Sequence, residues 1–184
     1  MKTLLHTCCA PCSIMCAETL RAENIEPVCF WYNPNIHPLS EYKARRNALA
    51  EYCRLAGLEL LLAGSYGLRE FISMIYPDFG SRCPNCYRSR LESAAKYAAE
   101  NSYESFSTTL LISPYQNHGL IKKIAEELAA KYGARFLYRD FRPYFREGQQ
   151  KAREQGLYMQ KYCGCIFSEE ERFRKNKKTP KSAE

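Results

Sequence analysis

The chain has 184 residues, of which 46% are hydrophobic and 26% charged, and it carries a net charge of +7. These values are typical of one soluble globular domain with a substantial core. The absence of any apolar run of about 18 residues excludes a transmembrane helix. The stretch before His6 is too short for the apolar part of a secretory signal. We therefore expect a cytoplasmic protein whose ten cysteines are thiols or metal ligands rather than disulfides.

The excess of basic residues has two explanations of equal weight. Six of the ten residues from Arg172 to Lys181 are basic. Residues 169–184 contribute +2 (six basic and four acidic side chains), which leaves +5 on the rest of the chain. A basic body favours a polyanionic partner such as RNA. A need for solubility alone would account for the same charge.

Short strand-like runs alternate with helical stretches along the chain. The expected strands are rich in aliphatic, aromatic and β-branched residues and comprise residues 3–6, 26–33, 58–64, 105–113 and 134–141. The expected helices comprise residues 13–21, 41–56, 68–75, 86–100, 119–132 and 143–155. Residues 156–173 show no clear pattern and are expected to be irregular.

Strands that alternate with helices predict a parallel sheet with helices on both faces, which makes three layers. Right-handed crossovers and five strands favour a doubly wound α/β fold with the strand order 3-2-1-4-5. We expect one catalytic domain over residues 1–170 and a basic, disordered tail over residues 171–184. Ligands of such sheets bind at the carboxyl ends of the strands, where the strand order reverses. A site is therefore expected between the first and fourth strands.

Cysteines gather near the expected site in three tight groups, which are Cys8 with Cys9, Cys83 with Cys86, and Cys163 with Cys165. The first group directly follows the first strand and is extended by Cys12 and Cys16. The second group opens a helix, whose positive end favours thiolates. Four thiolates suit either zinc or an iron–sulfur cluster, and the residues alone do not distinguish these two.

The third group, Cys163-Gly164-Cys165, has two interpretations. A disulfide between cysteines one residue apart closes a small, strained ring that is easily reduced, so this pair is a candidate redox couple. Gly164 relieves the crowding of the backbone between them. The alternative is that both cysteines complete a zinc site with Cys83 and Cys86.

Polar and aromatic residues also fall near the expected site. Asp140 ends the fifth expected strand, where it could ligate a metal, relay a proton or cap the helix that follows. Trp31 and Tyr32 could stack on an RNA base, although packing in the core is the favoured interpretation. Arg45 is expected to be an exposed basic residue without a specific role. Arg90, near the second cysteine group, is expected to bind phosphate or to offset thiolate charge.

Six motifs in a fixed order give the chain a resemblance to a known family. They are HTCCAPCS, YNPNIHP, RCPNCYRSRL, TTLLISPYQN, RDFRP and GLYMQKYCGC, and they run from residue 6 to residue 165. Together these motifs are highly specific, and by them the chain resembles the cobalamin-independent epoxyqueuosine reductases of the QueH family. The resemblance covers nearly the whole chain except the basic tail.

The resemblance implies the last step of queuosine biosynthesis in tRNA, in which epoxyqueuosine at the anticodon wobble position loses its epoxide oxygen and becomes queuosine. It also implies a fold of the HUP type, like that of adenine-nucleotide hydrolases. The implied cofactors are a [4Fe–4S] cluster and an adjacent mononuclear iron, and the implied partners are tRNA and an external electron donor. The cluster ligands carried over by motif are Cys8, Cys9, Cys83 and Cys86, and the redox-active disulfide pair is Cys163 with Cys165.

Four thiolates cannot saturate both a cubane cluster and a second iron. Cys12 and Asp140 are therefore candidates for additional metal ligation, and Asp140 is also a candidate catalytic residue. The alternative to a reductase is a zinc-stabilised RNA-binding protein without redox catalysis. A nucleotide-hydrolysing sulfur transferase is disfavoured, because the place of its phosphate-binding loop reads CCAPCS and is poor in glycine.

Overall fold

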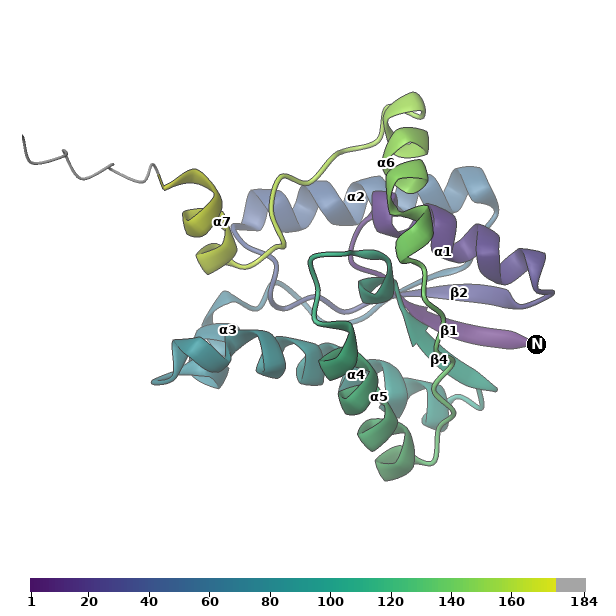
Figure 1. The fold of residues 1–184 in the computed structure, drawn as a ribbon, viewed down its shortest axis with the longest axis horizontal. Coiled ribbons are helices and arrows are strands. Elements are labelled where there is room, and N and C mark those ends of the chain that lie inside the picture. The colour runs from purple at the N-terminus through teal and green to yellow at the C-terminus, as the bar shows by residue number, and fades with distance from the viewer. Residues whose placement is uncertain (175–184) are drawn as a thin grey trace, which may run out of the picture.

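Four parallel strands form the centre of the computed structural model, which describes residues 1–174 (Figure 1). They are β1 (Lys2–His6), β2 (Glu26–Trp31), β3 (Leu60–Leu62) and β4 (Ser105–Thr108). The order β3-β2-β1-β4 confirms the predicted order of the first four strands and places β1 beside β4. The carboxyl ends of these two strands therefore lie together, as the expected site requires.

Helices cover both faces of the sheet and make the three predicted layers (Figure 1). One face is covered by α1 (Ala10–Ala22) and α2 (Leu39–Ala56), and α6 (Phe145–Glu154) packs on α1. The other face is covered by α4 (Arg82–Glu100) and α5 (His118–Tyr132). The shorter elements are α3 (Leu68–Ile75), α7 (Ile166–Phe173) and the 3₁₀ turns η1 (Phe79–Ser81), η2 (Thr109–Ile112) and η3 (Arg142–Tyr144). Within residues 1–174, every helix is too short or too polar to cross a membrane.

The predicted fifth strand is reduced to an isolated bridge, so the sheet has four strands rather than five. Phe106 donates its N–H to the carbonyl of Arg135 at 2.9 Å and accepts the N–H of Leu137 at 2.8 Å. An ion pair of 2.8 Å between Arg139 and Glu23 then holds the chain at the end of α1. The segment therefore leaves the edge of β4 after a single pair of backbone hydrogen bonds.

Both helices that carry site cysteines begin earlier than the sequence predicts. Helix α1 begins at Ala10, and Pro11 suits its first turn because the proline ring already has a helical φ. Helix α4 begins at Arg82, and Pro84 is tolerated there because the first N–H groups of a helix have no partner within it. Cys12 and Cys83 consequently lie in first turns, where the helix dipole stabilises negative charge.

The central strands bury polar as well as apolar side chains. Leu4 and Leu5 of β1 point to opposite faces and are both fully buried, as expected for a parallel strand covered on two sides. The buried His6 ring hydrogen-bonds the Thr108 hydroxyl at 2.9 Å and the Tyr32 carbonyl at 3.2 Å. Burial lowers the pKa of His6 to about 3, which keeps the ring neutral. His6 is therefore a structural residue that ties β1 to β4.

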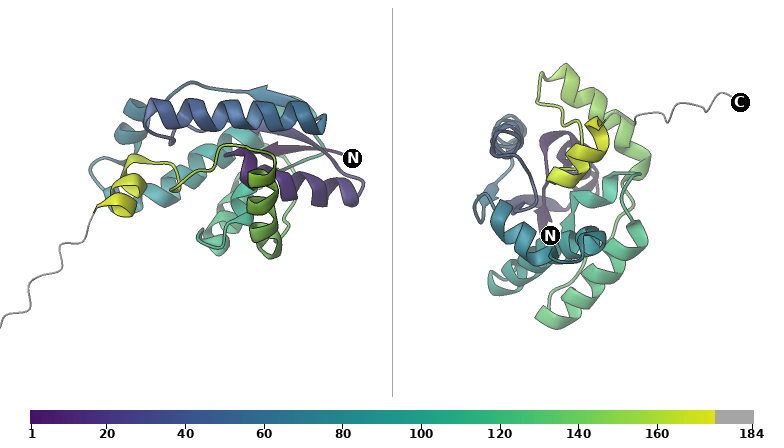
Figure 2. Two further views of the ribbon diagram at one scale, coloured as in Figure 1. Left: turned by 90° about the horizontal axis from the view of Figure 1, so that it is seen from above. Right: turned by 90° about the vertical axis from the view of Figure 1, so that its left-hand side faces the viewer.

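Helix α7 lies near the carboxyl ends of the strands, and the N-terminus lies at the opposite end of the sheet (Figure 2). This helix forms in a segment expected to be irregular, because the Cys165 sulfur accepts the N–H of Ser168 at 3.4 Å and caps the first turn. It ends at Phe173, so the tail predicted from residue 171 begins inside a helix. The rest of that tail, residues 175–184, lies outside the described part of the chain.

The contact between α1 and α6 depends on Gly148. A Cβ atom at this position would lie 3.0 Å from the carbonyl oxygen of Pro11 and 3.3 Å from the Met15 side chain. Gly148→Ala is therefore expected to lower the midpoint of thermal unfolding, although alanine is otherwise the better helix former by about 1 kcal/mol. Gly119→Ala in α5 is the control, since its Cβ would meet nothing closer than 3.8 Å. Equal midpoints for the two variants would contradict the tight contact.

Candidate functional site

Three cysteines lie together where β1 meets α1. Cys8 follows β1 closely, Cys9 precedes α1 in an extended conformation, and Cys12 lies in the first turn of that helix. Their sulfur atoms all lie within 4.8 Å of one another, and the Cys8 and Cys9 sulfurs are 3.7 Å apart. The structure thus joins Cys12 to the adjacent pair. Three thiols at the positive end of a helix form a soft ligand set suited to zinc or iron.

Hydrogen bonds lower the pKa of Cys8 relative to the pKa values of the other two cysteines in this group. Bonds from the Cys12 and Cys9 thiols hold the pKa of Cys8 well below its usual value, and the Thr109 hydroxyl donates a further bond at 3.4 Å. The bond to Cys8 raises the pKa of Cys12, and burial raises the pKa of Cys9. The Gln160 amide donates to the Cys9 sulfur at 3.0 Å. These hydrogen bonds therefore favour loss of the Cys8 proton over loss of the protons of its two neighbours, and the thiolate is the form that binds metals.

The remaining site cysteines meet near the start of α4. Cys83 and Cys86 lie on this helix, and a small buried apolar cluster contains both Cys86 and Cys165. Burial raises the pKa of Cys86 to about 12. Cys163 is exposed, and its sulfur accepts the Gln116 amide at 3.3 Å. The two cysteines of the Cys-Gly-Cys sequence therefore differ, because one is open to solvent and the other packs against the second cysteine group.

Arg90 links the two groups of cysteines. Its side chain is 2% exposed and donates to the Cys86 sulfur at 3.8 Å and to the Asn33 side-chain oxygen at 2.9 Å. Asn33 in turn donates to the carbonyl of Thr7, the residue before Cys8, at 2.8 Å. The Nε atom of Arg90 has no partner within residues 1–174. A buried cation is costly unless negative charge lies beside it, and the groups around Arg90 that can supply such charge are sulfur atoms.

Arg45 holds the loop that carries Cys163, and the expectation that Arg45 is exposed is wrong. Its side chain is 1% exposed and pairs with Glu41 at 2.7 Å. Its two terminal nitrogens donate to the carbonyl oxygens of Tyr162 and Cys163, both at 2.9 Å. Its guanidinium also lies 5.5 Å from the centre of the Tyr162 ring. The rigid fork of donors on arginine, which lysine lacks, is suited to gripping two carbonyls at once.

Gly164, the residue between the two redox candidates, is closely surrounded by other side chains. Gly164 has a φ of +147°, and a Cβ there would lie 3.3 Å from Ile36 and 3.4 Å from an Arg45 nitrogen. Its carbonyl accepts the N–H of His37 at 2.8 Å, and the His37 ring accepts the N–H of Ile166 at 3.4 Å. Glycine is therefore required at this position for both conformation and space.

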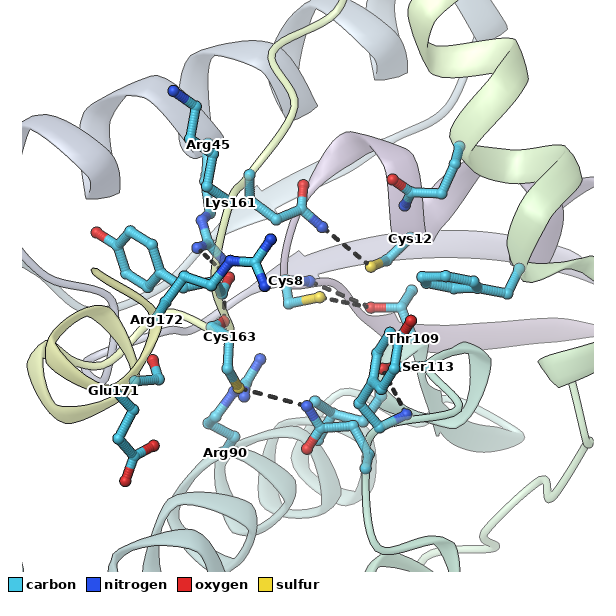
Figure 3. A pocket seen from close by; sticks show the side chains of 18 residues that line it. Cys8, Cys12, Arg45, Arg90, Thr109, Ser113, Lys161, Cys163, Glu171 and Arg172 are labelled. Carbon is cyan, nitrogen blue, oxygen red and sulfur yellow. Dashed lines mark hydrogen bonds between the residues drawn. The ribbon is translucent and has the colours of Figure 1, made fainter. Parts of the chain in front are cut away.

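A cavity of about 510 Å³ opens beside these groups (Figure 3). Three of the site cysteines (Cys8, Cys12 and Cys163) line it, together with Arg45 and Arg90. Its walls also contain polar and aromatic side chains, among them Tyr115, Gln116, Phe145, Gln160, Lys161 and Arg172. The volume falls within the range of about 300–1,000 Å³ that is typical of small-ligand sites.

Two of the sequence candidates lie outside this cavity. Asp140 is exposed, accepts the Arg142 backbone N–H at 3.1 Å and pairs with the Arg142 side chain at 2.6 Å. The hydrogen bond from that side chain lowers the pKa of Asp140 to about 2. Asp140 therefore binds the first residue of η3 from two positions before it, whereas the N-cap position of η3 is occupied by Phe141. Trp31 is fully buried and donates to the Tyr42 hydroxyl at 3.1 Å, so it is a core residue.

Sequence reasoning misses the amides and the aromatic ring at the cavity. Gln160 and Gln116 each donate to a cysteine sulfur, and Tyr115 lies at the rim with 85% of its surface exposed. Tyr115 and Gln116 fall inside the motif TTLLISPYQN, and Gln160 falls inside GLYMQKYCGC. These residues lie close in sequence to cysteines or to the end of a strand, and this position could have indicated a role at the site.

Comparison with known proteins assigns the chain to a family. The sequence model described as "Epoxyqueuosine reductase QueH" matches residues 3–171. A protein of the same name from Dehalococcoides mccartyi is 38% identical, over 95% of this chain and 96% of that protein. Another, from Thermotoga maritima, is 38% identical over 94% of this chain and 93% of that protein.

Two solved structures share the fold. The U34-tRNA thiolase NcsA from Methanococcus maripaludis, solved with its [4Fe-4S] cluster, has a TM-score of 0.58 at 15% identity and matches 91% of this chain and 61% of its own. A predicted subunit of a tRNA methyltransferase from Methanocaldococcus jannaschii has a TM-score of 0.52 at 13% identity and matches 85% and 89%. At such identities the likeness shows the fold alone, and it agrees with the predicted α/β class with a parallel sheet.

Arg45→Gln is expected to free the Cys163 loop, because the shorter side chain cannot reach both carbonyls. The rate at which a small alkylating agent modifies Cys163, followed by mass spectrometry, should rise several-fold. Arg45→Lys should behave in the same way if the fork, rather than the charge, holds the loop.

Arg46→Gln is the matched control for this experiment. Arg46 is the next residue on α2 and lies 6.0 Å from the centre of the Tyr42 ring, with no hydrogen bond to the Cys163 loop within residues 1–174. Its substitution should leave the alkylation rate of Cys163 unchanged. Equal rates in the Arg45 and Arg46 variants would contradict the role given to Arg45.

Proposed function

The chain belongs to the QueH family of epoxyqueuosine reductases, and on this basis we propose that it reduces epoxyqueuosine in the anticodon wobble position of tRNA to queuosine. This reaction removes the epoxide oxygen and leaves an alkene in the cyclopentane ring. The observation that carries the proposal is the convergence of Cys8, Cys12 and Cys163 on one cavity that Arg90 also lines. Such a cavity offers sulfur groups able to hold a redox metal and to donate electrons at the same place.

By the family motifs we assign Cys8, Cys9, Cys83 and Cys86 as the ligands of a [4Fe–4S] cluster. Among residues 1–174, the sulfurs that lie within 4.8 Å of one another are those of Cys8, Cys9 and Cys12, so Cys83 and Cys86 would have to join this group when the cluster binds. Arg90 supports this set, because it donates to Cys86 and is tied through Asn33 to the residue before Cys8. The negative charge of a cluster with four thiolates would also balance this buried cation. When bound, an iron–sulfur centre with an adjacent iron supplies single electrons and a Lewis acid that polarises oxygen.

We assign Cys12 as an additional metal ligand, on the side of the mononuclear iron. Its sulfur lies within 4.8 Å of those of Cys8 and Cys9, and it lines the cavity. Asp140, the other candidate, is paired with Arg142 and lies outside the cavity. The geometry therefore favours Cys12 over Asp140 for this role.

Cys163 and Cys165 would supply the two electrons that the reaction consumes. Two C–O bonds of the epoxide break, two S–H bonds break, one S–S bond forms, and the oxygen leaves as water, so that atoms and electrons balance. An external donor then reduces the disulfide. The open position of Cys163 in the cavity supports this role, as does the glycine that lets the chain turn between the two sulfurs. The partners of the protein would be tRNA and this donor, in the cytoplasm.

A zinc-stabilised RNA-binding protein without redox catalysis is the second candidate. The buried cluster that contains both Cys86 and Cys165 favours it, since a structural zinc site draws its ligands from two such pairs. In that case the basic charge of the chain would serve RNA binding, and the cysteines would serve stability.

Anaerobic iron reconstitution, followed by mass spectrometry of the nucleosides of epoxyqueuosine-containing tRNA, decides between these two functions. We expect iron and acid-labile sulfide in the protein, and loss of the mass of one oxygen from the modified nucleoside when a reductant is present. Zinc without iron or sulfide, together with an unchanged nucleoside, would support the second candidate instead.

Cys12→Ala is expected to lower the iron content of the reconstituted protein and to leave its acid-labile sulfide unchanged, because Cys12 is assigned to the mononuclear iron. Cys16→Ala is the control, since Cys16 lies one turn further along α1, is fully buried and does not line the cavity. That variant should keep both contents. Unchanged iron in Cys12→Ala would remove this residue from the metal centre.

A further inference from the structure

We propose that the rim of the cavity binds one unpaired nucleotide of the RNA, with its base stacked on Tyr115 and its neighbouring phosphates bound by Lys161 and Arg172. The inference rests on the proposed function and deepens it. Under this proposal, these three residues select a base that is no longer stacked between its neighbours. Enzymes that act on a base commonly need it in this extruded position, because its atoms are covered within a stack.

Tyr115 is an aromatic side chain left in water at the mouth of a cavity. With 85% of its surface exposed, it is the most exposed of the large hydrophobic residues in the described part of the chain. The Phe145 ring meets it at 5.9 Å and an angle of 85°, an edge contact that supports the ring from one direction. Exposed rings of this kind are the surfaces on which unpaired bases stack.

Hydrogen bonds from the Tyr115 backbone and from the Gln116 side chain hold the loop that carries Tyr115. Its N–H donates to the Ser113 hydroxyl at 3.3 Å. The next residue, Gln116, donates to the Cys163 sulfur at 3.3 Å and accepts the Tyr87 hydroxyl at 2.6 Å. Because the loop is held in this way, little backbone entropy is lost when a base stacks on the ring.

Two cations at the same rim have no carboxylate partner. Lys161 and Arg172 both line the cavity, and neither forms an ion pair with a residue in the range 1–174. The one acidic residue of the lining, Glu171, pairs with Arg82 and is thereby neutralised. The rim consequently keeps positive charge for phosphates on either side of the stacked base.

The arrangement favours an extruded base over a base within a double helix. Bases in a duplex are covered by their neighbours and cannot lie on a single ring at a cavity mouth. A base stacked on Tyr115 would direct its substituents into a cavity lined by Cys8 and Cys163. Binding and chemistry would then occur at opposite ends of one cavity.

The test uses an anticodon stem-loop RNA with the fluorescent base 2-aminopurine at the wobble position and the full chain reconstituted with iron. Stacking on Tyr115 should quench the fluorescence. Tyr115→Ala should lose most of the quenching and bind about tenfold more weakly, because stacking of one base on one ring typically contributes this much or more. Tyr115→Phe should keep both properties.

Tyr76→Ala is the matched control. Tyr76 is 70% exposed and meets Phe79 at 6.2 Å in a similar edge contact, but it does not line the cavity. With this variant, the quenching of 2-aminopurine fluorescence and the affinity for the RNA should equal those of the unchanged protein. Equal quenching in the Tyr115 and Tyr76 alanine variants would overturn the stacking assignment.

The phosphate contacts are tested by the dependence of binding on salt. Lys161→Ala and Arg172→Ala should each reduce the slope of log affinity against log salt concentration by about 0.7, the value for one phosphate of a single strand. Lys123→Ala, at an exposed lysine of α5 that does not line the cavity, should leave the slope unchanged. Three equal slopes would overturn the assignment of these cations.

Reduction of epoxyqueuosine in tRNA is measured with the same preparations, so that the two proposals fail separately. Turnover by the unchanged protein with undiminished quenching in Tyr115→Ala would overturn this inference and leave the proposed function intact. If Tyr115→Ala loses the quenching but no preparation reduces epoxyqueuosine, the result would support nucleotide binding at Tyr115 and would count against the reductase function.

Discussion

The site depends on how one buried positive charge is balanced. Arg90 is almost completely removed from solvent, and its strongest neighbours are a sulfur atom and a neutral amide. An unbalanced guanidinium in such a place would destabilise the fold, and a thiol buried without a nearby cation would stay protonated. Negative charge on sulfur removes both costs at once. The packing of α4 against the sheet and the ligand chemistry of the cysteines are therefore parts of one electrostatic arrangement.

The charge of the second buried arginine, Arg45, is balanced by a carboxylate rather than by sulfur. Arg45 has its own carboxylate, Glu41, on the preceding turn of α2 and brings no net charge to the cavity. Its remaining donors are free to hold the carbonyls of Tyr162 and Cys163. One arginine thus sets the electrostatics of the sulfur atoms, and the other sets the position of the loop that carries a thiol into the cavity.

Structural features that depend on the local sequence pattern are predicted correctly. Features that depend on contacts between residues far apart in the chain are not. The strand order and the position of Cys8 beyond β1 follow from hydrophobic periodicity and the rules of parallel sheets. The fifth strand is reduced to one bridge, and Arg139, a few residues further on, pairs with Glu23 on a distant element, a contact that local pattern does not reveal. Arg45 is missed because a glutamate four residues before an arginine is typical of an exposed helix face, and the loop it holds lies far along the chain. Helix α7 is missed because a sulfur atom replaces the usual oxygen as its cap.

The sulfur that caps α7 connects Cys165 to a helix that forms part of the cavity wall. The Cys165 sulfur is an acceptor for the first turn of α7, and the same helix places Ser168 and Arg172 against the cavity. A bond from this sulfur to another sulfur or to a metal would leave lone pairs on it but would fix the directions in which they point. One hydrogen bond thus connects the geometry of a thiol outside the cavity lining with a helix that contributes residues to that lining.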